Sequence, residues 1–197
     1  MTDLPPFGTD RPAPFVPSGN EGRSTVRQSR APFTLGTSEH RKVAFSLAAL
    51  VFVADQLMKW LVISPLNLKA ARQIVITPFF NLTWVENYGV SLGMLTASND
   101  LTRWLLVALT AAISAGVAVW IWREQIRADA LALALVLGGA LGNIVDRARF
   151  GYVVDYADLH FGGFQPFLVF NIADAAITIG VLLLLVRALL TREKKVP

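Results

Sequence analysis

Long apolar segments alternate with polar connections from residue 43 almost to the end of the chain. The four apolar segments cover residues 43–63, 101–122, 128–145 and 170–190. Each comes close to the roughly 20 residues that an α-helix needs to cross the hydrocarbon core of a bilayer. The pattern therefore predicts an all-α integral membrane protein with four transmembrane helices.

The connection between the first two predicted helices has a different pattern. Residues 73–82 read Gln-Ile-Val-Ile-Thr-Pro-Phe-Phe-Asn-Leu, and Thr-Trp-Val follows. Such β-branched and aromatic residues are typical of strands. We expect a small β-structure here, lying on the membrane surface.

The first 40 residues have another composition, rich in Pro, Ser, Thr, Gly and Arg. Because they have few apolar residues to bury, we expect a disordered extension. They also lack the apolar core of a cleavable signal peptide, so the first helix is expected to serve as the insertion signal. The predicted organisation is an extension over 1–40, a membrane domain over 41–192 and a short tail over 193–197.

Composition and charge agree with a membrane protein. Hydrophobic residues make up 54% of the chain and charged residues 16%, which is unusual for a soluble domain. Basic residues flank the apolar segments, so the positive-inside rule explains the net charge of +4 better than nucleic-acid binding does. The rule places both termini in the cytoplasm and the connections 64–100 and 146–169 outside.

Acidic residues border the last two apolar segments, where a carboxylate is rarely kept for packing alone. Asp155 and Asp174 would support acid–base chemistry if the fold brought them together, because neighbouring carboxylates cannot both ionise easily. The spacing also nominates Asp146, since Asn143 and Asp146 repeat the i,i+3 pattern that ends at Asp174. However, Arg147 follows Asp146 directly and favours a permanently ionised, structural carboxylate.

Other polar residues allow more than one interpretation. In the first helix, Asp55 and Lys59 are spaced i,i+4 and are expected to pair, either as structural support or with a direct role. Residues 89–93 match G-x-S-x-G, the nucleophile motif of serine hydrolases, with Ser91 at its centre. That motif requires an α/β sheet, which the sequence pattern does not predict here, so a glycine-rich turn beside a bound substrate is the preferred interpretation.

Cysteine is absent and there is no H-E-x-x-H motif, so no metal or other cofactor is expected.

These blocks, taken in order, resemble bacterial lipoprotein signal peptidase, also called signal peptidase II. The resemblance covers roughly residues 41–192 and rests on Asp55-Gln56 with Lys59, on Val85-Glu86-Asn87-Tyr88-Gly89, on residues 138–147, on Val153-Val154-Asp155-Tyr156 and on Phe170-Asn171-Ile172-Ala173-Asp174. Leu92 stands where the family often has Phe.

The resemblance implies an aspartyl protease of the bacterial cytoplasmic (inner) membrane. Such an enzyme removes signal peptides from diacylglyceryl-modified prolipoproteins, cleaving before the lipidated cysteine on the extracytoplasmic side. Its dyad corresponds to Asp155, in the loop before the fourth helix, and Asp174, in the first turn of that helix. The residues expected to support the dyad or bind substrate are Asp55, Lys59, Asn87, Gly89, Asn143, Asp146, Arg147 and Asn171. We expect a monomer in contact with membrane lipid.

Two other classes remain as alternatives. A small transporter or assembly factor would also keep polar residues inside its helices, but nearer the middle of the membrane. Here the polar residues concentrate at the outer ends of the third and fourth predicted helices, which favours an enzyme acting at the membrane surface. A serine-type hydrolase using Ser91 is the other alternative.

Overall fold

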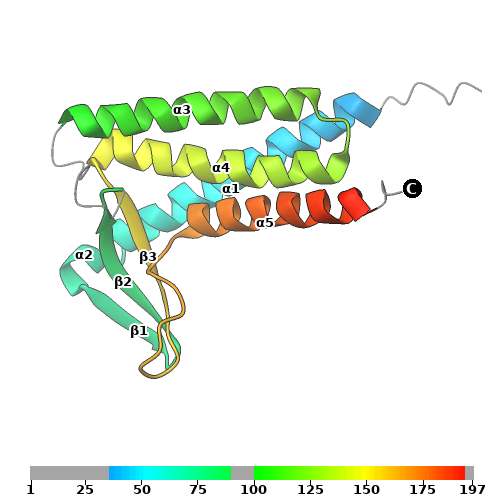
Figure 1. The fold of residues 1–197 in the computed structure, drawn as a ribbon. Coiled ribbons are helices and arrows are strands. Elements are labelled where there is room, and N and C mark those ends of the chain that lie inside the picture. Colours follow the sequence, from blue (N-terminus) through cyan, green and yellow to red (C-terminus); the bar gives the residue numbers. More distant parts are fainter. Residues whose placement is uncertain (1–35, 90–99, 194–197) are drawn as a thin grey trace, which may run out of the picture. The chain divides into compact units, whose positions relative to one another are not determined.

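A computed structural model describes residues 36–89 and 100–193 of the chain (Figure 1). Its long helices are α1 (Gly36–Ile63), α3 (Asp100–Arg123), α4 (Arg127–Phe150) and α5 (Ile172–Glu193). All four are long and apolar enough to cross a membrane, which confirms the four predicted helices. The expectations for Ser91, Leu92 and most of the two terminal segments lie outside the described residues.

The α4 helix is the centre of the bundle and packs against α1, α3 and α5. Half of its membrane-spanning window is buried, against 11% to 22% for the other three helices. Glycines allow this close approach, because a Cβ at Gly138 would lie 2.5 Å from the carbonyl oxygen of Ala48 on α1. Gly139 and Gly180 similarly face backbone carbonyls of α5 and α4. Small residues at helix contacts are a common means of packing helices in membranes.

A three-stranded antiparallel sheet lies at one end of the bundle, in the order β1 (Gln73–Thr77), β2 (Phe80–Asn87) and β3 (Val153–Leu159). The short helix α2 (Leu68–Ala71) precedes β1. The predicted β-structure between the first two membrane helices is confirmed by β1 and β2. Its third strand, however, comes from the connection between α4 and α5, where the sequence had suggested a loop.

The prediction that Asp155 lies in a loop is therefore wrong, because this residue lies in β3. Nearly every residue of β3 is buried, so the strand lacks the alternation of apolar and polar residues that marks a half-exposed strand. It also contains two aspartates, which are uncommon in strands. Only pairing with β2 identifies it: Val85 pairs with Asp155, and Asn87 pairs with Val153.

The turn from α4 into β3 fixes where that strand starts. Gly151 ends α4 with a φ of 86°, a left-handed conformation that favours glycine. Arg103 of α3 donates hydrogen bonds to the carbonyls of Arg147 (2.8 Å) and Ala148 at the end of α4. The Arg147 carbonyl also accepts the Gly151 N–H at 3.1 Å, so Arg103 is a second donor there and adds a partner for the Ala148 carbonyl in the last turn. Together these contacts carry the chain from α4 directly into β3, beside the start of α5.

Candidate active site

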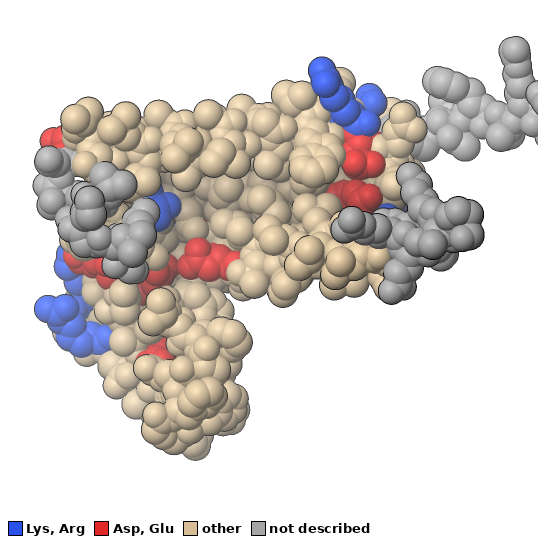
Figure 2. Space-filling model, viewed as in Figure 1, with Lys and Arg blue, Asp and Glu red and all other residues tan. Residues whose placement is uncertain are grey.

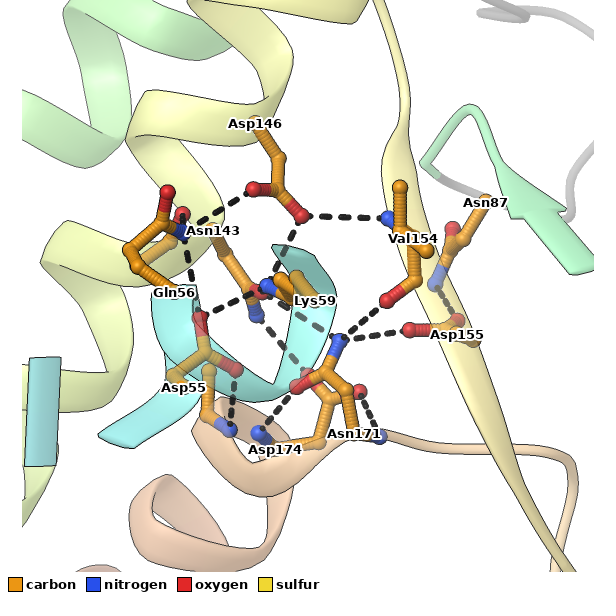
Figure 3. Close-up of polar contacts among 12 residues, drawn as sticks. Asp55, Gln56, Lys59, Asn87, Asn143, Asp146, Val154, Asp155, Asn171 and Asp174 are labelled. Carbon is orange, nitrogen blue, oxygen red and sulfur yellow. Dashed lines mark hydrogen bonds and ion pairs between the residues drawn. The ribbon is translucent and has the colours of Figure 1, made fainter. Parts of the chain in front are cut away.

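Asp155 and Asp174 come together where β3 meets the first turn of α5 (Figure 3). Asn171 contacts both of them. Its Nδ2 donates to Asp155 Oδ1 at 2.6 Å, and its backbone N–H donates to Asp174 Oδ2 at 3.3 Å. The Oδ1 of Asn171 in turn accepts from the backbone N–H of Asp174 at 2.9 Å. Two residues that are remote in the sequence therefore form one carboxylate pair.

Two further amides hold the outer oxygens of this pair. Asn87 Nδ2 on β2 donates to Asp155 Oδ2 at 3.0 Å, and Asn143 Nδ2 on α4 donates to Asp174 Oδ1 at 2.8 Å. Neither aspartate makes an ion pair among residues 36–89 and 100–193. Neutral donors orient the carboxylates without fixing a negative charge on both of them.

Burial raises the pKa of Asp155 from its ordinary value of 3.8 to about 7, and the negative charge of nearby Asp174 acts in the same direction. Hydrogen bonds from Asn87 and Asn171 oppose this rise, but the burial effect is larger because the residue is only 2% exposed. Asp155 therefore holds a proton for much of the time near neutral pH. A carboxylic acid beside a carboxylate is the arrangement needed for general acid–base catalysis.

A second pair of carboxylates lies deeper in the bundle and shares one ammonium group. Lys59 Nζ is 2.8 Å from Asp55 Oδ2 and 2.7 Å from Asp146 Oδ2, and all three side chains are at most 2% exposed. The predicted pairing of Asp55 with Lys59 is confirmed. The neighbouring Arg147 had suggested an ionised, structural Asp146; among the described residues, the cation that pairs with Asp146 is Lys59 and not Arg147.

Further contacts complete the hydrogen bonding of the deeper pair. Gln56 Nε2 donates to Asp146 Oδ1 at 3.0 Å, and the Val154 backbone N–H donates to Asp146 Oδ2 at 3.1 Å. The backbone N–H of Ala173, which precedes Asp174, donates to Asp55 Oδ1 at 3.0 Å. Asp55 and Asp146 thus fix the starts of α5 and β3, the two elements that carry Asp174 and Asp155.

Asn143 joins the two carboxylate pairs into one network. Its Oδ1 accepts from Lys59 Nζ at 3.1 Å, while its Nδ2 donates to Asp174. Asn143 and Asp146, which are spaced i,i+3 on α4, therefore have different contacts. Asn143 contacts Asp174, whereas Asp146 belongs to the deeper pair with Asp55. The network gathers Asp55, Lys59, Asn87, Asn143, Asp146 and Asn171 around Asp155 and Asp174.

Gly89 and Arg147 lie at the edge of this network. The Gly89 N–H donates to Asn87 Oδ1 at 3.0 Å, and its φ of +88° favours glycine. A Cβ at Gly89 would be 3.8 Å from Arg147 Nη2, so the guanidinium lies beside this turn. Within the described parts of the chain Arg147 forms no ion pair, although its charge lies near Asp174 and Asp155. Its buried Nε has no hydrogen-bond partner in the part of the chain that the structure describes.

Sequence reasoning did not assign a site role to Gln56 or Arg103. Gln56 could have been found, because an amide next to Asp55 inside an apolar helix needs a buried partner. Arg103 gave no comparable signal, since a basic residue near a helix end usually faces water or lipid headgroups.

The opposite face of β2 is fixed by a cluster around Glu86. Lys69 Nζ lies 2.9 Å from Glu86 Oε1, and the Tyr88 hydroxyl donates to Glu86 Oε2 at 2.7 Å. These hydrogen bonds lower the pKa of Glu86 to about 2. Trp84 Nε1 also donates to Glu86, at 3.2 Å. Because side chains alternate along a strand, this cluster secures the end of β2 while Asn87 points to Asp155.

An apolar groove opens beside Asp174. Its volume is about 250 Å³, and apart from Asp174 its lining is almost entirely apolar: Phe167, Leu168, Phe170, Ala175, Thr178 and Ile179. The groove runs along the exposed side of α5. It therefore leads from Asp174 along the apolar side of α5.

Comparisons with known proteins agree over most of the chain. A model of the family described as signal peptidase (SPase) II matches residues 47–190. The lipoprotein signal peptidase of Rhizorhabdus wittichii is 59% identical over 160 residues, which cover 81% of this chain and 93% of that protein. That of Caulobacter vibrioides is 38% identical over 154 residues, covering 78% and 90% respectively. A bacterial membrane enzyme solved by the in meso method at 2.3 Å matches with a TM-score of 0.67 and 28% identity, covering 79% of this chain and 92% of that one.

Proposed function

Because this chain belongs to the signal peptidase II family of membrane aspartyl proteases, which process prolipoproteins, we propose that Asp155 and Asp174 are its catalytic dyad. The observation that carries this assignment is that one residue holds both carboxylates: the side-chain amide of Asn171 donates to Asp155 and its backbone N–H donates to Asp174. Neither carboxylate forms an ion pair among the described residues. The raised pKa of Asp155 also supports it, since one member of a working dyad must be protonated.

In the proposed reaction, Asp155 starts protonated and Asp174 ionised. The first turn of α5 supports this assignment for Asp174, because the positive end of the helix dipole favours an anion. Asp174 takes a proton from a water molecule as the water oxygen bonds to the scissile carbonyl carbon. Asp155 gives its proton to the carbonyl oxygen, which produces a neutral tetrahedral intermediate.

Collapse of that intermediate completes the cleavage. Asp155, now ionised, takes a proton back from a hydroxyl of the intermediate, and Asp174 transfers its proton to the leaving nitrogen. The C–N bond breaks, the carbonyl re-forms, and the dyad returns to its starting state with one shared proton. The amides of Asn87, Asn143 and Asn171 orient the carboxylates throughout.

The proposed substrate is a prolipoprotein whose cysteine carries a diacylglyceryl group, cleaved on the amino side of that cysteine. The apolar groove beside Asp174 supports a lipid-bearing substrate, since it joins the dyad to the lipid-facing side of α5. Gly89 and the Arg147 guanidinium lie side by side at the edge of the network, where the substrate backbone is proposed to approach.

The proposed setting is the inner membrane, with both termini in the cytoplasm and the dyad at the extracytoplasmic face. Arg41 in the first turns of α1 lies over Trp122 at the end of α3, 5.0 Å from the ring centroid; a cation beside a Trp ring supports an interface with lipid headgroups at the end remote from the sheet. The polar network is complete within one chain, which supports a monomer that contacts membrane lipid.

The experiment that tests this function is incubation of the purified protein with a diacylglyceryl-modified prolipoprotein and with the same precursor lacking the lipid. We expect cleavage of the lipidated form only, before the modified cysteine, unaffected by EDTA or serine reagents. Ser91→Ala should retain substantial turnover. Inhibition by EDTA that zinc reverses, or a folded but inactive Ser91→Ala variant, would exclude the aspartyl mechanism.

A further inference from the structure

The far end of the sheet carries exposed apolar side chains that the proposed reaction does not use. They come from β1, from the turn between β1 and β2, and from the connection that follows β3. We call this set the apolar tip; its members, each 50% to 69% exposed, are Val75, Ile76, Phe79, Phe161 and Phe164. An exposed apolar patch of this kind marks a surface that contacts something other than water.

Backbone hydrogen bonds hold the two connections of the apolar tip together. The His160 N–H donates to the Phe79 carbonyl at 3.0 Å. Phe161 and Phe164 exchange backbone hydrogen bonds of 2.8 and 3.2 Å across a two-residue turn. Gly162 in that turn has a φ of +61°, which favours glycine. The aromatic rings are thus presented by a tight turn fastened to its neighbour.

The tip contains no Asp, Glu, Lys or Arg, and neither do its flanking residues over 73–82 and 160–171. The visible face of the far end of the sheet is accordingly free of charged atoms in Figure 2. Asp158, just before this region, is 4% exposed and accepts hydrogen bonds from Thr83 and Gln165. Uncharged segments rich in aromatic residues are typical of the interface between lipid and water.

The position of the sheet also favours lipid as the occupant. Figure 1 shows the strands lying across the end of the bundle, with the β1–β2 turn projecting beyond the side of α5. Phe167 and Leu168, which follow the tip in the chain, are 61% and 88% exposed and share a groove with Ile179 of α5. The apolar tip is therefore continuous with the lipid-facing surface of a helix that spans the membrane.

We propose that the apolar tip inserts into the phospholipid leaflet on the active-site side of the membrane. The sheet is then anchored to the bilayer at both ends, by the helix bundle at one end and by the tip at the other. Asp155 lies on β3 between these anchors. Its depth relative to the lipid is thereby fixed, as cleavage next to a lipid-bearing residue requires.

Fluorescence of a single labelled cysteine tests the insertion, because the chain contains no cysteine of its own. Phe164→Cys and, separately, Val75→Cys would carry an environment-sensitive NBD label in the full chain. The protein would be placed in nanodiscs of phosphatidylethanolamine and phosphatidylglycerol, with and without lipid bearing a nitroxide near the glycerol end of its acyl chain. Ala70→Cys, on the exposed surface of α2 beside Lys69, is the matched control.

We expect blue-shifted emission and strong quenching by the nitroxide lipid at positions 164 and 75, and water-like emission with little such quenching at position 70. Thermal unfolding would first establish that each labelled variant is folded. Water-like emission with iodide quenching at both tip positions would overturn the proposal. Protection from iodide and from nitroxide lipid alike would also overturn it, in favour of a protein partner or a second copy of the chain. None of these readouts depends on cleavage, so the proposal and the proposed function fail independently.

Discussion

Two carboxylate pairs occupy one buried network, yet they are held in different ways. Asp55 and Asp146 share the ammonium group of Lys59, whereas Asp155 and Asp174 are held by the amides of asparagines. A cation stabilises the ionised form of a carboxylate, while an amide orients the group and leaves it able to bind a proton. The difference indicates that Asp55 and Asp146 support the fold and that Asp155 and Asp174 are available for proton transfer.

The largest effect on the cleavage rate is expected from substitution of Asp155 or Asp174. Asp155→Asn or Asp174→Asn should lower single-turnover cleavage of the lipidated precursor by about a thousandfold or more, because each removes an acid–base group while preserving shape. Both variants should remain folded and bind the precursor. Single-turnover rates and precursor binding, measured in one detergent, check this.

Asp146→Asn is the control that separates the two pairs. It weakens the contact with Lys59, so it should lower stability or precursor affinity while leaving measurable cleavage. A near-normal rate for Asp155→Asn, together with an inactive Asp146→Asn variant that still binds, would reassign the dyad to Asp146 and Asp174.

The next largest effect is expected from substitution of Lys59, the cation shared by Asp55 and Asp146. Lys59→Met should destabilise the protein by about 3 to 5 kcal/mol, because it leaves two carboxylates buried without their partner. Unfolding by SDS in mixed micelles gives the free energy. Lys42→Met on the same helix is the matched control: its pair with Glu39 is exposed, so the change should be within about 0.5 kcal/mol. An equal decrease in the free energy of unfolding for both variants would mean that the buried ion triad contributes no more to stability than the exposed pair does.

A smaller effect concerns pH. The pKa of Asp155 is about 7 in the folded protein, against 3.8 as its ordinary value, so the folded state keeps a proton that the unfolded state loses. This group therefore makes stability fall as pH rises from about 4 to 7, and it adds no further slope above that window. Asp155→Asn should remove this slope. The stability of the variant relative to the parent should therefore be roughly 3 to 4 kcal/mol more favourable at pH 8 than at pH 4.

Thermal unfolding midpoints across this pH range give the comparison. Asp158→Asn, the same substitution on the same strand, should keep the slope that Asp155 produces. Identical pH dependence in the parent and in Asp155→Asn would contradict the raised pKa. Cleavage by the parent should also decline above pH 7, because the proposed acid is then ionised.

The smallest effect is expected at the half-exposed ion pair on the sheet. Glu86→Gln should destabilise the protein by about 0.5 to 1 kcal/mol at pH 7, since Lys69 is 59% exposed and solvent screens the pair. The pKa of Glu86 is lowered to about 2, so this contribution is present above about pH 4.5 and is lost as pH falls toward 2. A loss that persists at pH 2.5 would indicate packing and not charge.

The sequence alone determined the membrane architecture and the type of chemistry. The thickness of the bilayer sets the length of an apolar segment, so the helices could be located to within a few residues, except for the start of α1 and the end of α4. The same environment makes a buried carboxylate conspicuous, which is why Asp155 and Asp174 stood out before any contact was known.

Only the tertiary structure decided which groups meet. Spacing along a helix linked Asp146 with Asp174, and adjacency linked it with Arg147, but packing of α1 against α4 placed Lys59 beside it instead. The strand carrying Asp155 was hidden because strand pairing joins residues far apart in sequence and leaves no local period when both faces are buried. The local sequence pattern indicates which residues are able to carry charge or exchange protons. Contacts between helices and strands that are far apart in the sequence decide that Asp55 and Asp146 pair with Lys59 while Asp155 and Asp174 pair with each other.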